Sequence, residues 1–374
     1  MENKKTHHAP LGIIALDSSK KLGESVEYYI KTWRKEEQGN DTSYLISAKC
    51  ERFGSGEAKC KINESIRGMD IYILVDVCNY SMTYKAFGIE RHYSPDDHFA
   101  DLKRVIAAMA GKATRITVIM PFLYESRQHK RMSRESLDSA IALQELVNMG
   151  VDSIITFDAH DPRIQNAIPL HGFDTVPAVY QFSKTLFRKY PEIPKNLNNL
   201  IVVSPDEGAM SRAVYYGNVL GCDVGMFYKR RDYTQVVDGT NPIVAQEFLG
   251  SDLKGKDVII IDDMISSGGS MIGVAKELKK RSANRIFLVC TFGLFTDGLE
   301  MFDKAYEEGL FDAVLTTNLI YQTPELLSRE YYVSVDVNKY VALLIDRLNN
   351  DGSISEYITP TNRIKKLIEE YKNK

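Results

Sequence analysis

Short apolar runs alternate along the chain with longer segments in which apolar residues recur at helical spacing. The runs lie at residues 11–15, 70–75, 116–120, 152–157, 200–203, 224–228, 258–261, 285–291, 311–316 and 331–335. Helical spacing is found, for example, in residues 97–111, 133–149 and 337–348. Short β-branched runs are typical of strands buried on both faces of a parallel sheet. The alternation therefore predicts an α/β fold with mostly parallel sheets flanked by helices.

Composition sets broad limits on this fold. A length of 374 residues is natural for two domains, and a net charge of -3 argues against a bulk nucleic-acid binder. No apolar run reaches membrane-spanning length, and the first twelve residues lack the apolar core of a signal peptide. The five cysteines contain no CxxC pair. We therefore expect reduced thiols in a cytoplasmic protein that binds neither nucleic acid nor membrane.

Residues 258–271, VIIIDDMISSGGSM, combine an apolar strand, two acids, a Gly/Ser loop and the start of a helix near Ser270. Backbone N–H groups of such a loop and of a helix N-terminus attract phosphate. The carboxylates of Asp262 and Asp263 suit two neighbouring sugar hydroxyls. A Gly/Ser loop alone would favour a simple helix cap, but the unbroken run favours a ribose-phosphate site. Its predicted contacts are Asp262, Asp263, Ser266, Ser267, Gly268, Gly269 and Ser270.

Three further segments place polar residues after predicted strands. Residues 127–131 (RQHKR) and 229–231 (KRR) are rich in cations, which suit polyphosphate. Residues 158–161 (DAHD) could bind Mg²⁺, although this ion prefers oxygen ligands. Taken singly, residues 127–131 are equally consistent with a solvated loop. A KRR run alone is usually solvated, and a lone histidine more often has a hydrogen-bonded structural role.

Together these segments resemble the ribose-phosphate diphosphokinases, also called PRPP synthetases, which have the type I phosphoribosyltransferase fold. The matching segments are RFGSGE and INESIRGMDIYIL at residues 52–74, PFLYESRQHKR at 121–131, DAHDPRIQ at 158–165, SPDEGAMSRA at 204–213, KRR at 229–231, and the run at 258–271. They follow the family's order and cover roughly residues 11–355. Residues 79–98 form an insertion outside the resemblance.

The resemblance implies a role for each matched residue. Lys229 and Arg231 would stabilise the transferring diphosphoryl group, and Asp158 and His160 would bind Mg²⁺. The base and ribose of ATP would lie against residues of a hairpin that reaches a neighbouring subunit and of a loop after the third strand. These ATP-binding residues are Phe53, Ser55, Glu57, Arg127 and Gln128. The chain would form a homo-oligomer built from dimers, of which a hexamer is one arrangement.

The predicted organisation follows from the same resemblance. Residues 1–178 would form one phosphoribosyltransferase-like domain and residues 179–340 a second, with the boundary near residues 176–187. Residues 341–374 would be a helix and tail that pack back on the first domain. The implied reaction converts ATP and ribose 5-phosphate to AMP and PRPP.

Two alternatives remain at this point. A phosphoribosyltransferase that consumes PRPP would share the central loop, but would not explain RQ, KRR and the amino-terminal hairpin together. A non-catalytic regulatory paralogue of the synthetase would explain three departures from the family pattern. These are Ser55 and His129, where other residues are usual, and the lack of an acid near Val179.

Overall fold

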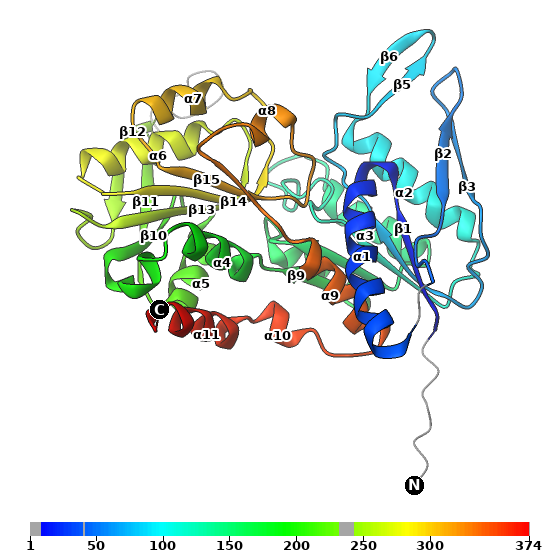
Figure 1. The fold of residues 1–374 in the computed structure, drawn as a ribbon. Helices are drawn as coiled ribbons and strands as arrows, with labels where there is room; N and C mark the ends of the chain where they lie inside the picture. Colours follow the sequence, from blue (N-terminus) through cyan, green and yellow to red (C-terminus); the bar gives the residue numbers. More distant parts are fainter. Residues whose placement is uncertain (1–8, 40–41, 232–242, 374) are drawn as a thin grey trace. The chain divides into compact units, whose positions relative to one another are not determined.

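A computed structural model describes residues 9–39, 42–231 and 243–373 (Figure 1). The side chains of residues 37–38, 229–231 and 243–246 lie outside this description. The chain forms two compact units. Unit 1 consists of Met1–Pro177, Asn318–Tyr321 and Asp336–Thr359, and unit 2 consists of Ala178–Thr317, Gln322–Val335 and Pro360–Lys374.

Unit 1 is built around a parallel five-stranded sheet with the strand order β1-β4-β7-β8-β9. Its strands are β1 (Leu11–Ala15), β4 (Asp70–Leu74), β7 (Arg115–Ile119), β8 (Ser153–Phe157) and β9 (Gly172–Val176). Every residue of β4 is buried. Both faces of the sheet are therefore covered, as the apolar runs predicted.

The helices of unit 1 follow the pattern of apolar positions. They are η1 (Asp17–Ser19), α1 (Lys20–Gln38), α2 (Pro95–Met109), α3 (Asp138–Asn148), η2 (Pro162–Ala167), α9 (Asn338–Asn349) and α10 (Ser355–Ile358). α2 begins with a capping box, in which the Ser94 hydroxyl and the Asp97 carboxylate each accept a backbone N–H of the other residue. Pro95 occupies the first helical position, where no N–H is needed.

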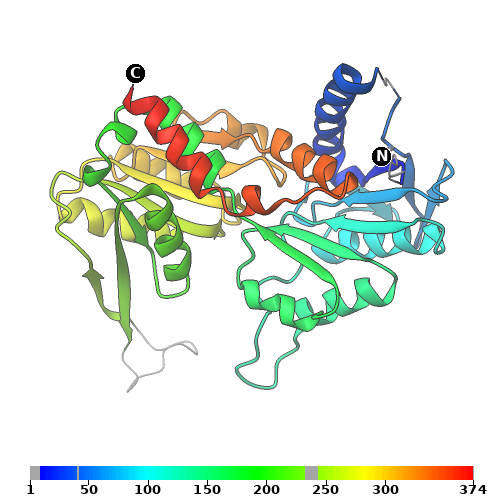
Figure 2. The same ribbon diagram turned by 90° about the horizontal axis from the view of Figure 1, so that it is seen from below.

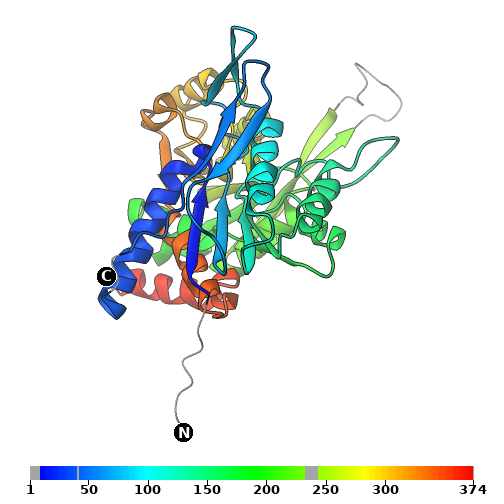
Figure 3. The same ribbon diagram turned by 90° about the vertical axis from the view of Figure 1, so that its right-hand side faces the viewer.

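Two antiparallel hairpins lie outside the main sheet of unit 1. One consists of β2 (Ala48–Arg52) and β3 (Ala58–Ile62), and the other of β5 (Thr83–Ala86) and β6 (Ile89–His92). Figures 1 and 3 show the two hairpins side by side. The second hairpin forms the middle of the insertion at residues 79–98.

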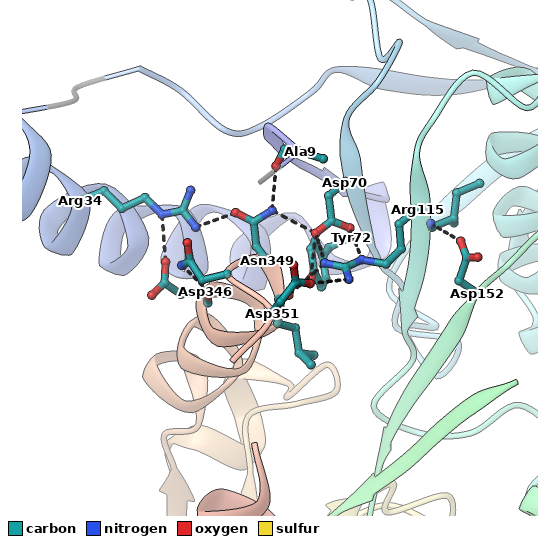
Figure 4. A network of polar contacts seen from close by, with 12 residues as sticks. Ala9, Arg34, Asp70, Tyr72, Arg115, Asp152, Asp346, Asn349 and Asp351 are labelled. Carbon is teal, nitrogen blue, oxygen red and sulfur yellow. Dashed lines mark hydrogen bonds and ion pairs between the residues drawn. The ribbon is translucent and has the colours of Figure 1, made fainter. Parts of the chain in front are cut away.

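A network of polar contacts fixes α9 within unit 1 (Figure 4). The carboxylate of Asp70 is almost fully buried and forms an ion pair with Arg115, at 2.6 Å between Nη2 and Oδ2. The side-chain amide of Asn349 donates to the same Oδ2 at 2.9 Å. Arg34 of α1 donates from Nε to Asp346 at 2.9 Å. Because a buried carboxylate is stable only when its lone pairs are satisfied, this network joins α9 to the start of β4.

Unit 2 is built around a seven-stranded sheet with the strand order β12-β11-β10-β13-β14-β15-β16. Its strands are β10 (Leu200–Ser204), β11 (Asp223–Arg231), β12 (Ile243–Leu249), β13 (Asp257–Ile265), β14 (Ile286–Gly293), β15 (Ala313–Thr317) and β16 (Tyr332–Val335). All neighbouring pairs are parallel except β11 and β12. The α/β fold class with mostly parallel sheets is thus confirmed.

Helices cover both faces of this sheet. They are α4 (Val179–Lys189), η3 (Ile193–Lys195), η4 (Leu197–Asn199), α5 (Met210–Leu220), α6 (Gly269–Lys280), α7 (Glu300–Glu307), α8 (Pro324–Leu327) and α11 (Thr361–Lys372). Successive residues of β13 enter opposite cores: Ile259 packs in the core with α4 and α5, and Ile260 in the core with α6 and α7. This alternation anchors β13 at the centre of unit 2.

The carboxyl-terminal segment differs from the prediction that residues 341–374 pack on the first domain. Residues 336–359 do belong to unit 1, but α11 belongs to unit 2. The buried side chains of Ile364, Leu367 and Ile368 join the core that contains α4 and α5. Figure 2 shows α11, in red, along the green helices of unit 2. The apolar side of this charged helix is therefore buried in unit 2.

Candidate active site

The acidic pair lies within the central strand of unit 2. β13 continues to Ile265, so Asp262 and Asp263 are inside the strand rather than after its end. Asp263 is almost fully buried, and the side chain of Asp262 keeps about a quarter of its surface exposed. The strand continues because it pairs with β14 beyond the acids, as far as Ile265 opposite Gly293.

Arg212 is a cation that our sequence prediction did not single out. It lies in the first turn of α5, and its Nη1 is 3.6 Å from Oδ1 of Asp262 and 3.7 Å from Oδ1 of Asp263. Burial, followed by the charge of Asp263, raises the pKa of Asp262 to about 8, and Arg212 opposes this rise. The sequence signal was its place in the SPDEGAMSRA segment at residues 204–213, which matches the family pattern.

The loop before α5 carries the SPDEGA segment. The hydroxyl of Ser204 donates to the carbonyl of Asp206 at 2.5 Å, and the N–H of Gly208 donates to the Asp206 carboxylate at 3.0 Å. Ala209 has a φ of -88°, which alanine adopts without strain. These bonds define the start of the helix that presents Arg212.

The predicted phosphate loop joins β13 to α6, which begins at Gly269. Gly268 has a φ of +91°, and a Cβ there would lie 2.2 Å from Cζ of Phe302. A Cβ on Gly269 would meet only the Ser267 hydroxyl, at 4.0 Å. Gly268 is required by the backbone and by packing, whereas Gly269 leaves open space at the helix N-terminus.

The two predicted catalytic cations lie on the last residues of β11. In the antiparallel pairing with β12, Lys229 is opposite Gln246 and Arg231 is opposite Ile243. The side chains of Lys229 and Arg231 lie outside the described residues, as does the predicted catalytic loop at residues 232–242. Their roles therefore stay predictions.

In unit 1, the turn between β2 and β3 carries three predicted ATP-binding residues. Half of the Phe53 surface is exposed, and Lys59 Nζ lies 5.8 Å from the centre of its ring. The hydroxyl of Ser55 donates to the Glu57 carboxylate at 2.8 Å. The structure thus brings Phe53, Ser55 and Glu57 together on one exposed turn.

The remaining predicted nucleotide contacts, Arg127 and Gln128, lie in the loop after β7. Arg127 is exposed, and the Gln128 side-chain amide donates to the carbonyl of Ser136 at 2.7 Å. The neighbouring His129 is largely buried, with its Nε2 3.4 Å from the Asp161 carboxylate. Histidine at this position therefore faces an acid of the next loop.

The predicted metal ligands Asp158 and His160 follow β8. Asp158 has a φ of +37°, and its N–H donates to the carbonyl of Val176 at 3.1 Å. His160 is exposed, and its ring centre lies 5.3 Å from that of His129. Arg163, followed by weaker effects that include His129, lowers the pKa of Asp161 to about 2. Among the described residues, no group of three or more His, Cys, Asp or Glu could by itself hold a metal.

Comparisons with known proteins agree over most of the chain. Residues 11–150 match the N-terminal domain of ribose phosphate pyrophosphokinase, and residues 174–320 match the phosphoribosyl transferase domain. The ribose-phosphate pyrophosphokinase of Vibrio parahaemolyticus is 30% identical over 315 residues, covering 83% of this chain and 90% of that protein. The ribose-phosphate pyrophosphokinase of Shewanella oneidensis is 30% identical over 311 residues, covering 81% of this chain and 88% of that protein.

A solved structure supports the fold. The crystal structure of phosphoribosylpyrophosphate synthetase from Mycobacterium smegmatis has a TM-score of 0.72 against this chain at 22% identity. The match covers 92% of this chain and all of the other. Within the described residues, no helix has both the length and the apolar character needed to cross a membrane.

Proposed function

The chain belongs to the ribose-phosphate pyrophosphokinase family, and from this premise we propose that it transfers the diphosphoryl group of ATP to ribose 5-phosphate. The products would be AMP and PRPP. The observation that carries this proposal is the match to a relative of that name over 83% of the chain and 90% of the relative. The chain is accordingly a transferase.

On the sugar side, the loop at residues 266–268 and the first N–H groups of α6 would bind the 5-phosphate. Gly269 leaves room for this anion. Asp262 and Asp263 would accept hydrogen bonds from the ribose hydroxyls. Because its pKa is raised to about 8, Asp262 can share a proton with a hydroxyl near neutral pH.

In the transfer step, the C1 oxygen of the sugar would attack the β-phosphorus of ATP. The bond from that phosphorus to the oxygen of the α-phosphate would break, and AMP would leave. Such reactions depend on alignment and charge stabilisation more than on covalent help. Lys229 and Arg231 would supply positive charge to the transferring group.

Asp158 and His160 would bind Mg²⁺, which supplies charge neutralisation on the phosphates of ATP. Two protein ligands are sufficient for this role, because Mg²⁺ in phosphate sites usually keeps several waters and binds phosphate oxygens. The exposed ring of His160 and the partly exposed carboxylate of Asp158 fit such a site.

On the nucleotide side, Phe53 would stack on adenine, while Ser55, Glu57, Arg127 and Gln128 would contact the rest of ATP. We further propose a homo-oligomer built from dimers, in which the β2–β3 turn contributes to a neighbour's site. Mixing Phe53→Ala chains with Lys229→Ala chains should then restore part of the activity. A fully active monomer would contradict the shared site.

One assay tests the proposed function. The chain is incubated with Mg²⁺, ATP and ribose 5-phosphate, and AMP and PRPP are measured together. Equal amounts of both products are expected. A chain that makes neither product, but changes the rate of an active synthetase, would be a regulatory paralogue.

The five cysteines are free thiols, which supports our proposal that the protein works in the cytoplasm.

A further inference from the structure

The β5–β6 hairpin belongs to the insertion that the family resemblance does not explain. It is nevertheless hydrogen-bonded to the turn that carries Phe53. The N–H of Phe87, at the tip of the insertion, donates to the carbonyl of Gly54 at 2.8 Å. The two hairpins lie side by side in Figures 1 and 3, so this bond joins one tip to the other.

A second contact holds the base of the same turn. The Arg52 guanidinium lies 5.0 Å from the ring centre of Tyr84 and 4.8 Å from that of Tyr93. It also forms ion pairs with Asp101, at 3.1 Å, and with Asp97, at 3.6 Å. Only 7% of its side-chain surface is exposed. The insertion thus supplies two aromatic faces to the arginine that precedes Phe53.

The turn itself is tight and packs against the insertion. The N–H of Phe53 donates to the carbonyl of Glu57 at 2.7 Å, and the N–H of Gly56 donates to the carbonyl of Phe53 at 2.9 Å. A Cβ on Gly56, whose φ is +93°, would lie 3.5 Å from Cβ of Ala86. The backbone of the turn is therefore in close reach of β5.

The geometry of the insertion's tip is also specific. Phe87 and Gly88 both have positive φ, of 53° and 79°, which is the pattern of a two-residue type I′ turn. The Phe87 side chain is 77% exposed, so no packing of the ring explains this conformation. The turn directs the Phe87 N–H to the neighbouring hairpin.

We propose that the β5–β6 hairpin is a positioning element, which holds Phe53 and Glu57 ready for the base and ribose of ATP. This inference rests on the proposed function, because it assumes that Phe53 contacts ATP. An isolated two-stranded hairpin is only marginally stable in water. Two hairpins that hold each other in place lose less conformational entropy on ATP binding than one free hairpin would. The affinity for ATP is therefore higher than with a free hairpin.

The main test uses a variant in which the insertion is shortened. Met82 and Tyr93 face each other, since the Tyr93 N–H donates to the Met82 carbonyl at 2.9 Å. Residues 83–92 can therefore be replaced by Asn-Gly, a sequence suited to a two-residue turn. We expect the KM for ATP to rise about tenfold, because Phe53 would no longer be held in place to stack on adenine. The KM for ribose 5-phosphate should stay unchanged.

A second readout does not depend on activity. Hydrogen exchange at the amides of Phe53 and Gly56 should become about tenfold faster or more in the shortened protein, since their bonds open more often. A folded shortened protein with wild-type exchange at both amides would overturn the proposal. So would faster exchange with an unchanged KM for ATP.

Point variants give a matched comparison that keeps the insertion. Tyr84→Leu removes one ring beside Arg52 and should raise the KM for ATP, whereas Tyr84→Phe keeps the ring and should leave it unchanged. Phe87→Gly keeps the N–H and tolerates positive φ, so it should also behave as wild type. Equal effects of Tyr84→Leu and Tyr84→Phe would overturn the role of the Arg52 contact.

Failure of this inference differs from failure of the proposed function. If the wild-type chain makes PRPP and the shortened protein makes it equally efficiently, only the positioning role is overturned. A wild-type chain that makes no PRPP from ATP and ribose 5-phosphate overturns both.

Discussion

The proposed sugar-phosphate site in unit 2 and the proposed nucleotide site in unit 1 obtain their geometry in different ways. Asp263 is almost fully buried on a central strand, and Gly268 packs against Phe302. Phe53, by contrast, is half exposed on a turn that a second hairpin holds in place. Core packing positions the first site, whereas polar and aromatic contacts at the surface position the second. Variants should therefore affect folding more in unit 2 and ligand binding more in unit 1.

The largest effect is expected from Lys229→Ala. Lys229 is proposed to stabilise the transferring diphosphoryl group, so its loss should lower turnover by about 10²–10³-fold without unfolding the chain. Steady-state rates at saturating substrates measure this loss. Lys254→Ala removes an exposed lysine of unit 2 and serves as the control. Turnover near the wild-type value in Lys229→Ala would remove Lys229 from the proposed mechanism.

The packed character of the unit 2 site can be tested at two adjacent glycines. Gly268→Ala forces a left-handed alanine against Phe302 and should lower the free energy of unfolding by about 2–4 kcal/mol. Gly269→Ala lies in a helix with open space around it and should raise this free energy by up to about 1 kcal/mol. Urea denaturation of both variants measures the difference. Equal effects would mean that Gly268 is not held by packing.

The burial of Asp262 makes the stability of unit 2 depend on pH. Because its pKa is raised from 3.8 to about 8 in the folded chain, its contribution to stability is full below pH 3.8 and is lost as the pH rises through about 8. Asp262→Asn stays neutral, so its stability relative to wild type should grow over this range, by about 1 kcal/mol or more. Denaturation at several pH values tests this. Glu308→Gln, at an exposed position, should show no such trend.

A smaller effect is expected on the exposed nucleotide side. Phe53→Ala should raise the KM for ATP about tenfold, because a stacked base loses its aromatic partner, with little change in stability. Phe53→Tyr keeps the ring and is the matched control. Initial rates over a range of ATP concentrations provide the comparison. A loss of stability in Phe53→Ala comparable to that of Gly268→Ala would contradict the contrast between the two regions.

Local sequence patterns predicted most of the fold. Apolar runs located ten of the twelve strands in the two main sheets, but not β9 or β12. The run at residues 258–271 forms the strand and the helix start that it predicted. These features depend on neighbours in the sequence. The exact end of β13 does not depend on sequence neighbours alone, because its pairing with β14 extends the strand past Asp262 and Asp263.

Features that depend on distant contacts could not be predicted in this way. Arg212 approaches the acids only because α5 and β13 lie together, and the need for glycine at Gly268 comes from Phe302 on α7. The polar insertion at residues 79–98 gave no sign that its tip bonds to Gly54. We predicted that residues 341–374 pack on the first domain, since no local pattern indicated that unit 2 would cover α11.

The central claim is that the loop before α6 binds the phosphate of the sugar and not ATP. Gly269→Val is the most direct probe, because its side chain enters open space and should not disturb the fold. Calorimetric titration should show the Kd for ribose 5-phosphate rising about tenfold or more, as charge-assisted hydrogen bonds are lost, with the Kd for Mg²⁺-ATP nearly unchanged. Gly273→Val, one turn further along α6, controls for helix propensity. Equal losses for both ligands, or no loss for ribose 5-phosphate, would contradict the claim.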